Sequence, residues 1–130
     1  MSGFVGLVPA FRLRLRNIPL KTEYPSNGSV EAIVDTGYEG FLAVPSSIFR
    51  AVRLDEIVTR QAVVEVADGR RLQSEVAYGT VELDGVEGEF DGPVETVAGL
   101  GEVLVGVRLL SEFRFTLDYC ARAVSVNPCR

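Results

Sequence analysis

The residues of this chain best suited to carry out chemistry are Asp35-Thr36-Gly37, which place a carboxylate in a glycine-containing turn. The tripeptide directly follows the apolar run Ala32-Ile33-Val34, which is typical of a short buried strand. Two carboxylates held about 3 Å apart cannot both ionise, so they share a proton and can activate a water molecule without a metal ion. The tripeptide occurs once in 130 residues, so the motif supplies one such carboxylate per chain.

Two segments before the tripeptide are expected to form a hairpin that carries Asp35 at its end. Residues 10–16 alternate between apolar side chains and arginine, as a half-buried strand does. Residues 30–34 form a compact, largely apolar run, and residues 24–28 (Tyr-Pro-Ser-Asn-Gly) have the composition of a turn.

The rest of the chain contains further strand signals and two candidate helices. Residues 45–52 predict a helix of about two turns with proline in its first turn, and residues 107–113 predict a second short helix. Residues 62–67 and 71–83 predict two long strands joined near Asp68-Gly69, since Asp-Gly is a strong hairpin signal.

Several smaller features complete this expectation. The alternation of the second long strand changes phase at Gly79, which predicts a bulge. Alternating apolar residues over 113–117 and the valines at 124 and 126 predict two final strands. Ile33-Val34-Asp35 also resembles Leu104-Val105-Gly106, which stands in the matching place before the second helix.

These pieces, in this order and spacing, resemble the retropepsin-like aspartic peptidases, especially a short prokaryotic branch with the pattern D-T-G-[FY]-x-G. The resemblance covers residues 10–126, nearly the whole of a single domain over residues 1–130. It implies a mostly β fold, a retropepsin-like acid-protease closed β-barrel with one or two short helices. It also implies a homodimer, in which Asp35 of each chain supplies one carboxylate of the catalytic pair.

The resemblance assigns roles to the residues around Asp35. Thr36 matches the threonine whose hydroxyl bonds across the dimer axis, although a local turn hydrogen bond is the simpler role. Gly37 leaves room for its backbone to approach the carboxylate closely. The flap that closes over substrate matches the hairpin tip at Ala67, Asp68, Gly69 and Arg70. Leu104-Val105-Gly106 matches an apolar element packed beneath the catalytic loop.

Tyr38 and Glu39 depart from the commonest retropepsin pattern, which has alanine or serine directly after the tripeptide. Tyr38 could fill part of the substrate cleft, point into the domain, or donate a hydrogen bond to Asp35 and so lower its pKa. Glu39 would raise a carboxylate pKa if it approached the catalytic pair and would have no effect if it faced solvent.

Composition excludes several other kinds of protein. The chain is 47% hydrophobic and 24% charged, as a globular domain is, and it has no histidine for a Ser-His-Asp triad or a typical zinc site. The net charge of −5 argues against nucleic-acid binding, and the arginines within residues 10–16 are interpreted as a solvated strand face. We expect no metal or cofactor, no signal peptide, no membrane segment and a cytoplasmic location, with Cys120 and Cys129 as free thiols.

Three functions remain open on the sequence alone. The leading hypothesis is an aspartic endopeptidase that binds a peptide or protein substrate as an extended strand under two flaps. The second is a non-catalytic peptide- or protein-binding module on the same fold. The third is an unrelated small β-barrel in which Asp35-Thr36-Gly37 is only a turn.

Overall fold

The protein is built almost entirely of strands. The structure, a computed structural model, describes residues 3–65 and 68–129. Its strands are β1 (Gly3–Val5), β2 (Val8–Asn17), β3 (Thr22–Tyr24), β4 (Val30–Val34), β5 (Leu42–Ala43), β6 (Arg60–Glu65), β7 (Arg71–Leu83), β8 (Phe90–Val97), β9 (Leu104–Val105), β10 (Arg114–Asp118) and β11 (Ala123–Asn127). The helices are α1 (Ser46–Ala51), α2 (Val107–Leu110) and a 3₁₀ turn, η1 (Leu54–Glu56). The predicted mostly β fold with two short helices is confirmed.

Within the described residues, one nine-stranded sheet runs in the order β1-β2-β4-β9-β5-β8-β7-β6, with β3 beside β2. β2 also pairs with β7, so the pairings β2–β4, β4–β9, β9–β5, β5–β8, β8–β7 and β7–β2 follow one another in a ring. The buried core draws side chains from these strands and both helices; its largest fully buried members are Phe11, Phe49, Leu13, Leu15, Leu42, Leu54 and Leu109.

The hairpin expected to deliver Asp35 is present. β2 and β4 pair antiparallel with Ala10 opposite Ile33 and Leu13 opposite Val30. The leucines and Phe11 of β2 are buried while its arginines are only partly covered, which confirms the predicted alternation. Burial of one face fixes the register, because a slip by one residue would expose the apolar side chains.

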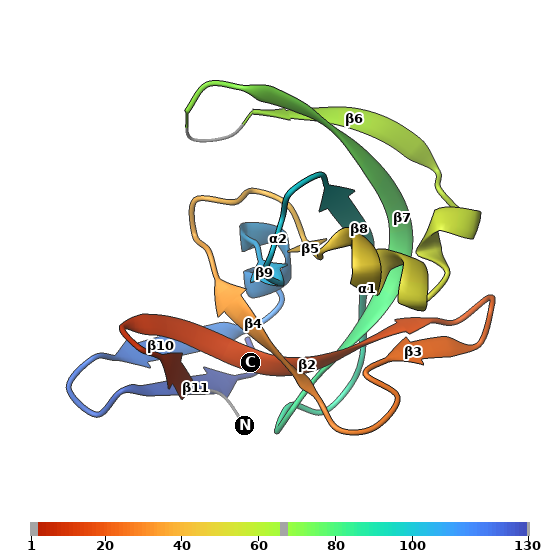
Figure 1. Ribbon diagram of the computed structural model, residues 1–130. Coiled ribbons are helices and arrows are strands. Elements are labelled where there is room, and N and C mark those ends of the chain that lie inside the picture. Colours follow the sequence, from red (N-terminus) through yellow and green to blue (C-terminus); the bar gives the residue numbers. More distant parts are fainter. Residues whose placement is uncertain (1–2, 66–67, 130) are drawn as a thin grey trace.

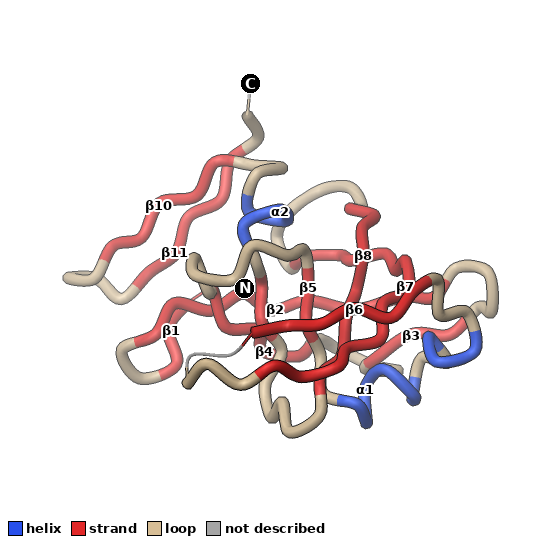
Figure 2. The backbone as a smooth tube through the Cα atoms, turned by 90° about the horizontal axis from the view of Figure 1, so that it is seen from above, coloured by secondary structure: helices blue, strands red, loops and turns tan. Residues whose placement is uncertain are grey.

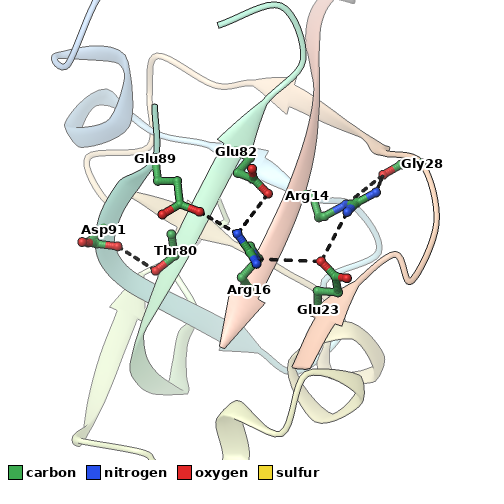
Figure 3. Close-up of polar contacts among 8 residues, drawn as sticks. All are labelled: Arg14, Arg16, Glu23, Gly28, Thr80, Glu82, Glu89 and Asp91. Carbon is green, nitrogen blue, oxygen red and sulfur yellow. Dashed lines mark hydrogen bonds and ion pairs between the residues drawn. The ribbon is translucent and has the colours of Figure 1, made fainter. Parts of the chain in front are cut away.

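The arginines of β2 lie among carboxylates (Figure 3). Arg16 forms ion pairs with Glu89 at 2.7 Å, Glu82 at 3.6 Å and Glu23 at 3.8 Å, and Arg14 lies 3.3 Å from Glu23. These side chains are between 30% and 45% exposed, so each pair contributes little to stability. The interpretation of this row as a solvated strand face is confirmed.

β6 and β7 form the long hairpin predicted around Asp68-Gly69. In Figure 1 it arches across the top of the molecule, and the loop between β4 and β5 (orange) lies below its tip. The bulge expected at Gly79 is wrong, since the pairing of β7 with β8 continues without a shift through Gly79 and Gly92. A side chain at Gly79 would come within 2.9 Å of Val94 and 3.1 Å of Leu15, so glycine is needed there for close packing.

The last two strands form a separate hairpin beside β1, as Figure 2 shows. The rings of Phe4 and Tyr119 meet edge to face at 5.0 Å, and the guanidinium of Arg122 donates to the backbone carbonyl of Gly6. Cys120 and Cys129 are free and exposed. In the part of the chain that the structure describes, no helix is long and apolar enough to cross a membrane.

Candidate active site

Parallel pairing of β4 with β9 positions Asp35. Ile33 lies opposite Leu104 and Val34 opposite Val105, so the two segments whose sequences resemble each other lie side by side. The pairing extends past both strands, because the backbone N–H of Asp35 donates to the carbonyl of Val105 at 3.0 Å. Asp35 is therefore the first residue beyond a strand whose end is fixed on both sides.

The loop after Asp35 is fastened to the start of α2. The backbone N–H groups of Val107 and Arg108 donate to the carbonyls of Tyr38 at 2.9 Å and Gly40 at 3.1 Å. These are first-turn donors that a helix cannot satisfy internally. Gly106 permits this approach, since a Cβ there would lie 2.1 Å from the carbonyl oxygen of Gly40. The predicted place of Leu104-Val105-Gly106 beside the loop is confirmed.

The tip of the loop presents the carboxylate to the surface. Oδ1 of Asp35 accepts a hydrogen bond from the backbone N–H of Gly37 at 3.0 Å, and a Cβ on Gly37 would crowd that oxygen at 3.3 Å. Thr36 and Gly37 are exposed, and within the described residues the Thr36 hydroxyl has no hydrogen-bond partner. Glu39 is exposed to solvent.

Tyr38 turns away from Asp35. Its half-buried phenol donates a hydrogen bond to Oε1 of Glu95 on β8, so the alternative in which it bonds to Asp35 is wrong. Oε2 of Glu95 accepts a longer hydrogen bond, 3.4 Å, from the hydroxyl of Ser74 on β7. Burial, followed by the hydrogen bond and the negative charge of Glu95, raises the pKa of Tyr38 far above its usual value, and the charge of Arg108 opposes this only in part.

A cavity of about 550 Å³ opens beside this pair. Its walls are mainly apolar, with Leu72 near the tip of the β6–β7 hairpin, Val97 and Leu100 at the end of β8, and Leu104 on β9. Tyr38, Glu95 and Arg70 supply its polar groups. Volume and lining are typical of a site that binds part of a ligand, since such pockets measure about 300–1,000 Å³ and hold few polar groups.

Of the predicted flap residues that the structure describes, Asp68, Gly69 and Arg70, one contributes to the cavity. That residue is Arg70, which lines the cavity. Its guanidinium also donates a hydrogen bond to the carboxylate of Asp68 at 2.7 Å. Asp68 and Gly69 form the exposed turn, with Gly69 at φ +87°, and do not line the cavity. Ala67 lies outside the described residues.

Sequence reasoning missed Glu95 and Ser74. The available signal was a glutamate at the centre of the apolar strand Pro93-Val94-Glu95-Thr96-Val97, where a charge needs a partner. The identity of that partner depends on tertiary contacts. Among the described residues, no group of three or more His, Cys, Asp or Glu side chains could hold a metal ion.

Comparison with known proteins agrees with this fold. The chain is similar to the crystal structure of the retroviral protease-like domain of Ddi1 from Leishmania major, with a TM-score of 0.55 and 16% identity over 91% of this chain and 88% of that one. The fold is therefore that of a retropepsin-like domain, as the first two hypotheses require.

Sequence comparison gives a nearer relative, although no protein-family model matches the chain. This chain is 36% identical over 126 residues to an uncharacterized protein of Archaeoglobus fulgidus, and the match covers 97% of this chain and 98% of that protein. The chain belongs to the same family as this archaeal protein and has a retropepsin-like fold.

Proposed function

We propose that the protein is an aspartic endopeptidase that works as a homodimer, with Asp35 of each chain in the active site. The observation that carries this proposal is the position of Asp35 on a retropepsin-like fold. Its carboxylate stands at the end of a strand anchored to β9, in a loop fastened to α2, with the exposed residues Thr36 and Gly37 beside it.

The chemistry follows from pairing two such carboxylates. At a separation of about 3 Å they share one proton, and the pair titrates as a unit. The ionised carboxylate takes a proton from a water molecule, which attacks the scissile carbonyl carbon, while the protonated carboxylate donates to the carbonyl oxygen. The two loops must be rigid for this geometry to hold.

The exposed loop tip supports the need for a second chain. A single chain offers one Asp35, and its Thr36 hydroxyl has no partner among the described residues. A second copy related by a two-fold axis through this tip would supply the other carboxylate and a partner for that hydroxyl. The cavity beside Tyr38 and the β6–β7 hairpin would then bind an extended peptide from both sides.

A non-catalytic binding module is the second candidate, and one specific observation favours it. The bulky Tyr38 side chain lines the cavity, so it occupies space beside the loop that a substrate would use. In that case peptides would bind in the same cavity and leave uncut.

The test is cleavage of a diverse peptide library by the purified protein from about pH 4 to 7, read by mass spectrometry beside Asp35→Asn. The substitution keeps the side-chain size and the acceptor for the Gly37 N–H. We expect cuts that vanish in Asp35→Asn, while sedimentation shows the same dimer for both proteins. Cuts that persist in the variant would overturn the proposal. A folded dimer that binds peptides without cutting them would establish the binding module.

A further inference from the structure

The cavity beside the catalytic loop contains a carboxylate without a matching cation. Glu95 lies half-buried in its wall, and the two groups bonded to it are the neutral hydroxyls of Tyr38 and Ser74. In the described part of the chain, no arginine or lysine lies within ion-pair distance of Glu95. Hydroxyl donors orient a carboxylate but leave its charge in place.

The two nearby arginines do not fill this role. Arg70 lines the same cavity, but its Nε bonds to the carboxylate of Asp68 at 2.7 Å, so its charge is already paired. That pair is largely exposed, at 69% for Arg70 and 56% for Asp68, so solvent screens it. Arg108 is an exposed residue of α2, and its charge is the smallest of the effects that act on the pKa of Tyr38.

The remaining walls suit a long side chain that ends in a positive charge. Leu72, Val97, Leu100 and Leu104 are apolar and line the same cavity as Glu95. Lysine and arginine bury their aliphatic stems against apolar surface while the charged head group seeks a carboxylate. A charged head group bonded to a partly buried carboxylate forms a stronger hydrogen bond than a neutral pair does.

We propose that Glu95 makes the protein select peptides with a lysine or arginine side chain at the position that enters this cavity. This inference rests on the proposed peptidase function, because it names the substrate class of the same site. Glu95 then has two roles. Its carboxylate accepts the hydrogen bond of Tyr38, and it binds the cationic head group of the substrate side chain.

The test compares peptides that differ at one position, occupied by lysine, arginine, norleucine or glutamate. Norleucine matches the lysine stem but lacks the charge. We expect wild-type kcat/KM to be at least about tenfold higher for the lysine and arginine peptides than for norleucine. Cleavage with no preference for the basic peptides would overturn the inference while leaving the peptidase function intact.

Glu95→Gln separates charge from structure, since its amide oxygen still accepts the Tyr38 hydrogen bond. We expect this variant to lose about tenfold or more of kcat/KM on the basic peptides and to cleave norleucine peptides as the wild type does. Glu87→Gln, in the exposed turn between β7 and β8, is the matched control for net charge and should retain the preference. An equal loss on all peptides in Glu95→Gln would mean that Glu95 only positions Tyr38, and would overturn the inference.

A binding measurement tests the preference for basic peptides even if the protein has no peptidase activity. Fluorescence anisotropy of labelled lysine and norleucine peptides with Asp35→Asn needs no cleavage. Tighter binding of the lysine peptide would support the inference even if the wild type cut nothing, and equal binding would overturn it. The comparison of the two peptides uses a protein in which Glu95 is unchanged. It therefore tests the inference even if Glu95→Gln fails to fold.

Discussion

The phenol of Tyr38 donates a hydrogen bond to the carboxylate of Glu95, which lies 57 residues further along the chain. The bond joins the loop that carries Asp35 to the middle of β8, and so links that loop to the wall of the cavity. Two further backbone bonds, from Val107 and Arg108, hold the other side of the loop. Tyr38 thus stabilises the loop from the side that faces the cavity.

Tyr38→Phe should destabilise the protein by about 1–3 kcal/mol, because it removes a hydrogen bond to a charged acceptor and leaves the partly buried Glu95 with one donor fewer. The ring itself is kept, so packing changes little. Urea unfolding near neutral pH measures the difference. A variant as stable as the wild type would show that the bond contributes nothing to the fold.

The Tyr38 phenol should stay protonated where an ordinary phenol ionises, near about pH 10. Its pKa is raised by burial and by the hydrogen bond and charge of Glu95. The rise in absorbance at 295 nm between about pH 9 and 11 should therefore be equal in the wild type and in Tyr38→Phe as long as both stay folded. A smaller rise in the variant would show that Tyr38 ionises in this range.

The same protonation gives stability a defined pH dependence. Because the folded-state pKa of Tyr38 is raised, its contribution is fully present below the unfolded value of about 10 and is lost as pH rises toward the folded value. The stability advantage of the wild type over Tyr38→Phe should hence shrink above about pH 10, by up to about 1.4 kcal/mol per pH unit. Urea unfolding at two pH values tests this, and a constant advantage would contradict it.

Local signals predicted much of the fold, because burial on one face of a strand leaves a period of two in the sequence. The helix expected at residues 45–52 is α1 at Ser46–Ala51, and the strand expected at 71–83 is β7. The helix expected at 107–113 stops at Leu110, and the chain then enters β10 at Arg114. Short strands of two or three residues, such as β5, carry no readable period and depend on their partners.

The site was predicted where it is local and missed where it depends on distant residues. Asp35 and Gly37 interact within three residues, so the motif alone indicates their contact. Tyr38 had three plausible directions, and only the position of β8 selects Glu95. At Gly79 the sequence predicted a bulge, whereas packing against Leu15 and Val94 explains the glycine without any change of register.

Gly106→Ala should destabilise the protein by about 3 kcal/mol or more, because its Cβ would meet the carbonyl oxygen of Gly40 at 2.1 Å. That oxygen accepts from the N–H of Arg108, so it cannot move away without losing a bond that fastens the loop. Gly101→Ala is the matched control, since nothing lies within 4 Å of a Cβ there, and it should change stability by less than about 0.5 kcal/mol. Urea unfolding of both variants makes the comparison, and equal effects would disprove the close packing of the loop on α2.

Mixing experiments should reveal whether two chains share one active site. If each site needs Asp35 from both chains, Asp35→Asn will form mixed dimers that hold one aspartate and cannot cut. At a fixed amount of wild type, an equal amount of the variant should reduce cleavage to about one half, and a ninefold excess to about one tenth, once subunits have exchanged.

The reason for this loss is statistical. With random pairing, the probability that the partner of a wild-type chain is also wild type equals the wild-type fraction of the mixture. Loss of activity on dilution of the wild type should follow the same logic, because dissociation separates the two carboxylates. The control is Glu87→Gln, whose exposed side chain lies in the β7–β8 turn. Adding this variant should cause no loss of cleavage by the wild type. Cleavage that stays constant while Asp35→Asn is added would show that one chain is a complete enzyme, and the shared site would be wrong.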